Sequence, residues 1–252
     1  MKLKQGGLGL TLVVMMPACF AAIPASTQYV DAQFNAVKAQ IAAITPGVAH
    51  PVGSCYGGGV VFYVNSNANA PVGQRGLIVA PSDANGTTTG TDALITGCTA
   101  GNPVTCVWDN SNTTGSNGTL VTGTSSLYFT GVANTTAITG TTNIPSGWPA
   151  AQAAEAYNTY NPPSTIPGCT GTMCNWALPS EDELATLYFQ STNINSFGST
   201  CMPTYTAPNA AYNYWSSTQD GAYLAWVVYF LAGSVGNSTT GDALPVRAVR
   251  AF

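Results

Sequence analysis

The apolar positions near the start of the chain follow a heptad spacing that no later segment repeats. Between residues 26 and 44 they recur at intervals of four, three, four and three: Val30, Phe34, Val37, Ile41 and Ile44. This spacing predicts a helix with a coiled-coil seam, and β-branched residues at its d positions favour three or more strands over two. We therefore predict a helical stalk over residues 22–47 that forms a homotrimer. The alternative is an amphipathic helix packed on its own domain.

The segment before the stalk has the pattern of an export signal. Two lysines precede an apolar stretch over residues 8–20, and small residues permit cleavage after Ala21 or after Ala25. We predict a signal peptide over residues 1–21 and an exported product, located outside the cell, on its surface or in the periplasm. Lipidation at Cys19 is the disfavoured alternative, because the residues before it make a poor lipobox. No later stretch approaches the roughly 18 apolar residues of a membrane helix, so none is predicted after signal removal.

Beyond residue 56 the apolar positions follow the short runs of a β-rich domain. Runs at 60–64, 76–80, 225–231 and 244–252 predict strands. Helices are predicted at 149–157, which starts with proline, and after Ser180, where Glu183 completes a capping box. Residues 82–146, dominated by Thr, Gly, Asn and Ser, predict loops with short hairpins. Strands and helices in separate runs indicate an α+β domain with small antiparallel sheets, two short helices and long loops.

Composition excludes several classes of function. Only 6% of residues are charged and the net charge is −4, so the chain lacks the basic surface of a nucleic-acid binder. The single histidine, His50, lies before the domain proper, and no Ser or Cys nucleophile can be paired with it. Neither a metal site nor a cofactor is predicted, since no C-x₂-C pair or phosphate-binding loop is present. We predict that the protein is not an enzyme.

The cysteines support export. Six of the seven follow the signal segment, and an even number in an exported chain predicts disulfides. Six cysteines allow 15 pairings, of which the local choice is Cys98–Cys106 and Cys169–Cys174, leaving Cys55–Cys201.

Three sets of landmarks, in this order, resemble the Lcl C-terminal domain family. That family is named from the Legionella collagen-like adhesin and is similar to the Fibrobacter succinogenes major paralogous domain. The landmarks are GGGVVFYV at 57–64 with GLIVAP at 76–81, WALPS at 176–180 with Glu183-Leu184, and YWSST at 214–218 with Ala225-Trp226 and VRAVR at 246–250.

The resemblance implies a C-type-lectin-like domain over residues 48–252, preceded by the N-terminal helix. It also implies an exported, non-catalytic surface adhesion or carbohydrate-recognition module, with a glycan or surface receptor as partner. The alternative is a structural surface or assembly domain without a small ligand. A relative of formylglycine-generating enzymes, which share the fold, is the less favoured third reading. Ala177 departs from the family pattern, which often has Arg there.

The ligand of the named adhesin, a sulfated polysaccharide, is not expected here. Binding such a chain requires clustered basic residues, and the mature protein has only Lys38, Arg75, Arg247 and Arg250. Any glycan is instead expected to stack on aromatic side chains in polar, turn-rich segments. The candidates are Trp108, Tyr205 and Tyr212, whereas Trp176, Trp215 and Trp226 are expected to fill the core.

The last strand predicts a structural ion pair. Arg247 and Arg250 have opposite parity along a strand, so one of them is expected to point inward. A buried arginine needs a partner, and Glu183 and Asp220 are the chief candidates, with Glu181 and Asp182 beside them.

Overall fold

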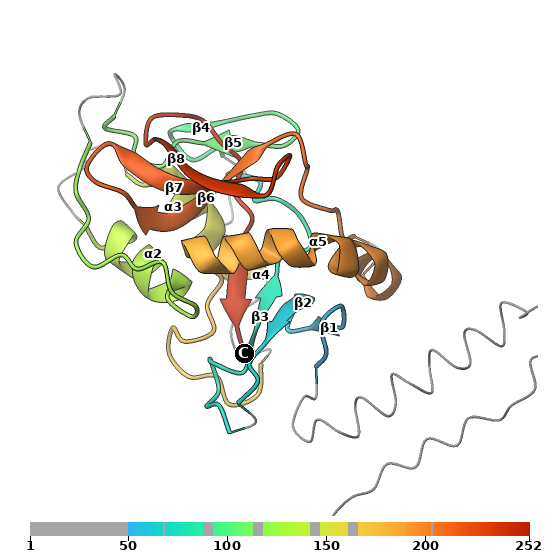
Figure 1. Cartoon of the computed structure of the whole chain (residues 1–252). Coiled ribbons are helices and arrows are strands. Elements are labelled where there is room, and N and C mark those ends of the chain that lie inside the picture. The colour runs from blue at the N-terminus through green and yellow to red at the C-terminus, as the bar shows by residue number, and fades with distance from the viewer. Residues whose placement is uncertain are drawn as a thin grey trace, which may run out of the picture. The chain divides into compact units, whose positions relative to one another are not determined.

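The computed structural model of the chain describes residues 50–67, 69–87, 93–112, 118–141, 147–160, 166–202 and 204–252. The predicted signal peptide and the predicted stalk lie outside these residues. The described part contains nine strands and four helices (Figure 1). In chain order they are β1 Cys55–Tyr56, β2 Gly59–Val64, β3 Gly76–Val79, β4 Cys98–Thr99, β5 Thr105–Cys106, α2 Gly131–Thr139, α3 Pro149–Glu155, α4 Tyr157–Tyr160, α5 Glu181–Cys201, β6 Asn213–Gln219, β7 Leu224–Tyr229, β8 Ser234–Thr239 and β9 Val249–Ala251.

Two antiparallel sheets dominate the architecture. The first has the strand order β1-β2-β3-β9, so the end of the chain pairs with strands from the start of the domain. The second is the meander β6-β7-β8, and β4 with β5 forms a separate two-stranded ribbon. The predicted α+β class with small antiparallel sheets is correct.

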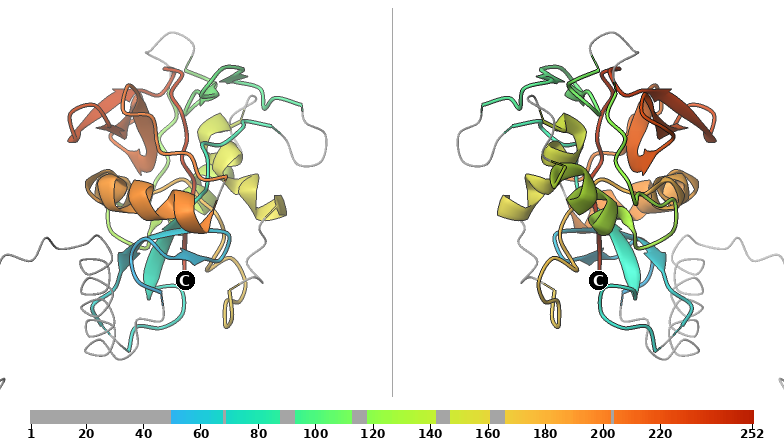
Figure 2. Two further views of the ribbon diagram at one scale, coloured as in Figure 1. Left: turned by 90° about the vertical axis from the view of Figure 1, so that its right-hand side faces the viewer. Right: turned by 90° about the vertical axis from the view of Figure 1, so that its left-hand side faces the viewer.

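Helix α5 lies between the two larger sheets, as all the views show (Figure 2). Its start is fixed by the predicted capping box: the Glu183 side chain accepts a hydrogen bond from the Ser180 amide at 2.8 Å, and Ser180 Oγ accepts one from the Glu183 amide at 3.4 Å. Leu184, Leu187 and Ile194 then share one buried face of the helix.

The core consists of two clusters of buried side chains. One contains four of the five tryptophans, each at most 2% exposed: Trp108, Trp148, Trp176 and Trp215. The other packs the buried face of α5 against Phe62 of β2 and Tyr214 of β6. Burial of this many large side chains is the main driving force for the fold.

The helices are where the sequence prediction was least accurate. Residues 82–146 contain α2, which its Thr-rich sequence does not suggest, because threonine is a weak helix former. The helix that starts at residue 181 runs for 21 residues rather than being short. Tertiary packing of α5 between two sheets supplies the stability that its polar second half lacks.

Disulfides join Cys98 to Cys106 and Cys169 to Cys174, which are the two local pairs that the spacing suggests. The first bridges directly paired positions of β4 and β5. Cys55 is also disulfide-bonded. Its pairing with Cys201 stays a prediction.

Candidate functional site

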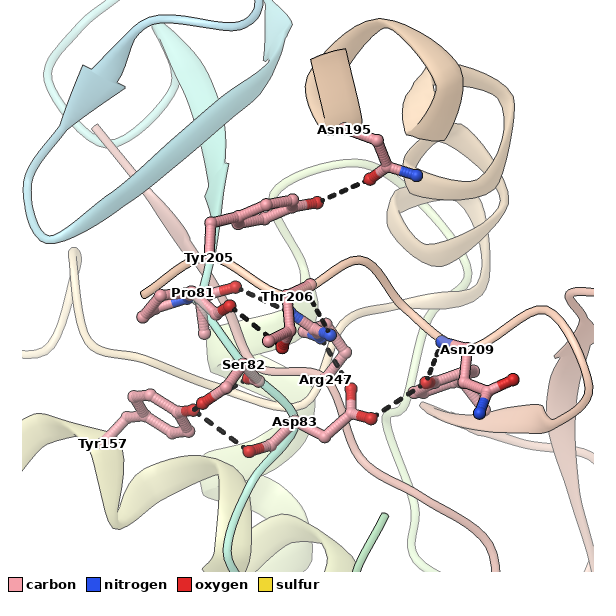
Figure 3. Close-up of polar contacts among 11 residues, drawn as sticks. Pro81, Ser82, Asp83, Tyr157, Asn195, Tyr205, Thr206, Asn209 and Arg247 are labelled. Atoms are coloured by element: carbon pink, nitrogen blue, oxygen red, sulfur yellow. Dashed lines mark hydrogen bonds and ion pairs between the residues drawn. The ribbon is translucent and has the colours of Figure 1, made fainter. Parts of the chain in front are cut away.

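Two of the three aromatic residues proposed as surface stackers are buried. Trp108 is 1% exposed, and its Nε1 donates to the Ser216 carbonyl at 2.8 Å. Tyr205 is 7% exposed, and its hydroxyl donates to Asn195 Oδ1 at 3.0 Å (Figure 3). The prediction of surface stacking was therefore wrong for both, because the polar segments around them fold over the rings. Tyr212 is partly buried and packs against the second core cluster.

Arg247 is the centre of a buried polar network (Figure 3). The residue is fully buried, and its Nε lies 2.7 Å from Asp83 Oδ1. Its two terminal nitrogens donate to the carbonyls of Ala80 and Thr206, each at 3.0 Å. The guanidinium thus connects the segment just before β9 to two loops that are distant in sequence.

Two tyrosine hydroxyls bond to the segment that carries Asp83. Tyr214 donates to Asp83 Oδ2 at 3.0 Å, and its oxygen accepts a hydrogen bond from the Asn209 amide. The Tyr157 hydroxyl lies 2.8 Å from the Ser82 carbonyl. Burial raises the pKa of Tyr214 and raises the pKa of Tyr205 to about 12, so both stay neutral donors at physiological pH. The network is committed to holding the fold together.

The ion pair therefore differs from the one proposed. Both Arg247 and Arg250 are buried, and the carboxylate beside Arg247 is Asp83, which the sequence analysis did not single out. Strand parity failed because the segment before β9 is irregular: regular pairing begins only at Val249. Arg250 packs its guanidinium 5.1 Å from the centre of the Trp176 ring and donates to the Gly57 carbonyl.

Glu183, predicted as a partner of an arginine, instead binds backbone amides. Its carboxyl group is fully buried and accepts hydrogen bonds from the amides of Ser180, Gly131 and Phe129. It therefore joins the starts of α5 and α2. Burial raises its pKa to about 7, against the opposing effect of these hydrogen bonds.

Trp226 is the one tryptophan of the described residues that is only partly buried. It was expected to fill the core, yet it belongs to neither core cluster. Its place in β7 sets its direction, because Trp226 pairs directly with Asn237 of β8 and directly paired residues share one face of a sheet. Val235, 40% exposed, lies on the same face.

Asn237, the cross-strand neighbour of this tryptophan, leads to further polar groups. Asn237 Nδ2 donates to Asp220 Oδ2 at 2.7 Å. The Glu181 carboxyl, at the start of α5, lies near enough to Asp220 and Asp182 that their charges raise its pKa, in addition to the larger effect of burial. We call Trp226, Asn237, Asp220 and Glu181 the Trp226 face. It combines one aromatic ring, one amide and two carboxylates drawn from four segments.

Such a set of side chains suits a hydroxyl-rich ligand. An indole face stacks on the apolar side of a sugar ring, while amide and carboxylate oxygens accept hydrogen bonds from hydroxyl groups. The sequence gives little signal for this face, because half-buried Trp226 of β7 and polar Asn237 of β8 become neighbours only through the hairpin. Among the described residues, no group of three His, Cys, Asp or Glu side chains is placed to hold a metal ion.

The sequence of this domain matches a known protein family. The model of the Lcl C-terminal domain matches residues 98–250, which is more than half of the chain. The chain belongs to the Lcl C-terminal domain family. Both the Trp226 face and the Arg247 network lie largely within the matched residues, although Asp83 precedes them.

Other comparisons add little. A solved structure of a fimbrial protein from Bacteroides ovatus ATCC 8483 resembles the chain with a TM-score of 0.45 and 16% sequence identity. The alignment covers 81% of this chain and 45% of the fimbrial chain, so this protein spans less than half of its length. No protein with a curated description matches the chain. No helix among the described residues is long and apolar enough to cross a membrane.

Proposed function

We propose that the chain is an exported, non-catalytic surface adhesion module that recognises uncharged carbohydrate at the Trp226 face. The proposal includes a signal peptide over residues 1–21, a trimeric stalk over 22–47 and a C-type-lectin-like domain over 48–252. Membership of the Lcl C-terminal domain family supports the adhesion role, because its namesake is an adhesin. The small antiparallel sheets and long loops are compatible with the lectin-like fold.

The observation that carries the ligand assignment is the position of Trp226. The other four tryptophans are at most 2% exposed, so burial in the core is the usual position of a tryptophan in this domain. Trp226 departs from that rule and lies beside the exposed Asn237 amide, which is hydrogen-bonded to the Asp220 carboxylate. An aromatic ring among hydrogen-bonding groups is a common arrangement for recognising a ligand with one apolar face and many hydroxyls.

Charge argues against an anionic glycan. Arg247 and Arg250 are fully buried in the fold, which leaves Arg75 as the exposed arginine of the described residues. Sulfated chains gain affinity from several neutralised charges, and the carboxylates of the Trp226 face would repel them. The ligand is therefore an uncharged sugar.

The test compares neutral glycans with heparin, using the purified mature chain on a glycan array and then in solution titrations. We expect binding to a neutral glycan that changes little between low and high salt, because stacking and neutral hydrogen bonds do not depend on long-range charge. Trp226→Ala should weaken that binding at least tenfold, while Trp226→Tyr should retain most of it. Tyr223→Ala, which removes an aromatic ring that is 48% exposed outside this face, is the matched control and should bind like the original chain.

Two outcomes would contradict the proposal. Tight heparin binding that collapses with salt would show that basic residues determine recognition. Absence of binding to every glycan would favour a structural or assembly domain without a small ligand.

A further inference from the structure

Two tyrosine rings lie face to face at the surface of the domain. Tyr63 belongs to β2, and Tyr128 belongs to the loop that precedes α2. Their ring centres are 4.7 Å apart, and the angle between the ring planes is 17°. Tyr128 is 38% exposed and Tyr63 is partly exposed, so small solutes in the solvent can reach both. We call these two residues the tyrosine pair, a feature that the function proposed above does not use.

Neighbouring residues hold the tyrosine pair in this stack. The Tyr128 hydroxyl is hydrogen-bonded to the Thr186 side chain of α5 at 2.5 Å. Phe129, the next residue, has a φ of 64°, in the left-handed region that a phenylalanine rarely adopts. Consecutive side chains of an extended segment point in opposite directions, yet Phe129 packs edge-on against the same Tyr63 ring on which Tyr128 stacks. The unusual backbone thus supports the contact between the two tyrosines.

The stack brings the reactive parts of the two phenols together. Burial raises the pKa of Tyr63, and the nearby Tyr128 hydroxyl raises it further, because two phenolate charges would repel each other. Nearly parallel rings at this separation present the carbons of one ring to the carbons of the other. An oxidised phenol carries its unpaired electron partly on the ring carbons next to its oxygen. A bond between two such carbons therefore requires little movement of either side chain.

We propose that the tyrosine pair is the site of a dityrosine cross-link between Tyr63 and Tyr128. The oxidant is hydrogen peroxide used by a haem peroxidase, which removes one electron and the hydroxyl proton from each phenol. The two phenoxyl radicals join through the ring carbons next to their oxygens. Each of these carbons then loses its proton, and each oxygen is protonated again. In total, two hydrogens leave the protein and one hydrogen peroxide becomes two waters.

Two properties of the domain favour this cross-link. The Cys98–Cys106 and Cys169–Cys174 disulfides are typical of proteins that reside in oxidising compartments. The partner ring is also already in place, so the coupling is an intramolecular step with a high effective concentration. An oxidised Tyr128 therefore couples to Tyr63 before it meets a tyrosine of another molecule.

The cross-link joins β2 to a part of the chain that is distant in sequence. A covalent bond that closes a long loop stabilises a protein by restricting its unfolded chain, as a disulfide does. We expect the melting temperature of the cross-linked protein to be about 5–10 °C higher than that of the original protein.

Treatment of the purified mature chain with dilute hydrogen peroxide and a haem peroxidase tests the proposal. We expect the blue fluorescence of dityrosine and an intact mass that is lower by two hydrogens. Proteolysis should release a cross-linked peptide that contains both Tyr63 and Tyr128. The fluorescent product should run as a single chain on a denaturing gel, because the coupling occurs within one molecule.

Phenylalanine variants identify the residues that couple. Tyr128→Phe keeps the ring but has no hydroxyl hydrogen to lose, so the dityrosine fluorescence of the single-chain product should fall at least tenfold and the rise in melting temperature should disappear. Tyr63→Phe should behave in the same way. Tyr223→Phe, which removes a hydroxyl from a residue that is 48% exposed and outside the pair, is the matched control and should cross-link like the original chain. Before oxidation, all three variants should melt within about 3 °C of the original chain, since each loses one hydroxyl from a residue that is not buried.

Two results would overturn the proposal. The first is undiminished fluorescence in the single-chain product of Tyr128→Phe, because other tyrosines would then be its source. The second is the absence of dityrosine within the original chain under conditions that oxidise free tyrosine added to the same mixture. Glycan binding is not part of these measurements, so they are independent of the function proposed for the Trp226 face.

Discussion

The domain buries two arginines three residues apart, and it stabilises them in different ways. Arg247 is held by the Asp83 carboxylate and two loop carbonyls. Arg250 packs on the face of Trp176 and donates to the Gly57 carbonyl in the turn before β2. Burial lowers the pKa of Arg250 to about 10, so it remains protonated at physiological pH.

The difference lies in where each guanidinium acts. Arg247 connects segments that have no regular secondary structure, where a charge-assisted network is the main source of fixed geometry. Arg250 lies on β9, whose position is already fixed by pairing with β3. The first arginine therefore organises loops, and the second fills a site that the sheet has already formed.

The largest effect is expected from removing the carboxylate beside Arg247. Asp83→Ala leaves a buried guanidinium without its anion, and we expect a loss of about 3–5 kcal/mol in the free energy of unfolding. Asp83→Asn should lose less, because the amide oxygen still accepts a hydrogen bond. Denaturant titration measures both, with Asp242→Ala as the exposed control carboxylate. A cost below 1 kcal/mol for Asp83→Ala would mean that the loops are held by their backbone contacts instead.

Glu183 extends the comparison to a buried carboxyl group without an arginine. Its pKa is about 7 in the folded protein and 4.5 in the unfolded reference, so folding favours the protonated form. The stability that this preference contributes is complete below pH 4.5 and is lost as pH rises through about 7. The loss is on the order of 3 kcal/mol, at 1.36 kcal/mol for each unit of pKa.

Denaturant titrations of the original chain and Glu183→Gln across that range isolate this contribution. Glutamine cannot ionise, so the difference in unfolding free energy between the two proteins should shift in favour of Glu183→Gln as the pH rises. A difference that stays constant with pH would show that the carboxyl group ionises freely in the folded state, with the amides of Ser180 and Gly131 stabilising its charge.

Residues with local signals were predicted well. The capping box at Ser180, the proline that opens α3 and the two short disulfides each depend on neighbouring residues, and the structure has all of them. The partner of Arg247 could not be found that way, since Asp83 lies 164 residues away and meets it only through loop packing. Trp108 was predicted to be exposed and Trp226 to be buried, and the structure differs on both for the same reason. The burial of a ring depends on which loops cover it, and the residues next to it in sequence do not encode that.

A smaller effect is expected at Arg250. Arg250→Met keeps much of the volume and the apolar contact with Trp176 but removes the charge, and it should cost about 2 kcal/mol, the size of a desolvated cation–π contact. Arg247→Met should cost more, because it strands the Asp83 carboxylate. An equal loss of unfolding free energy in the two methionine variants would show that the two arginines stabilise the fold to the same extent.

The smallest effect on stability is expected at Trp226, where a large ring contributes little to the core. Trp226→Ala should cost about 1 kcal/mol, because the ring is partly exposed and belongs to neither core cluster. Trp215→Ala, which empties a fully buried site on the neighbouring strand β6, should cost about 3–5 kcal/mol. Denaturant titration of the two variants side by side provides the measurement. Comparable losses would show that Trp226 is a packing residue, as its sequence first suggested, and would remove the physical basis for placing a ligand there. A small loss of stability together with a loss of glycan binding would show that Trp226 acts in recognition. The fold would then not need the ring, whereas the ligand would.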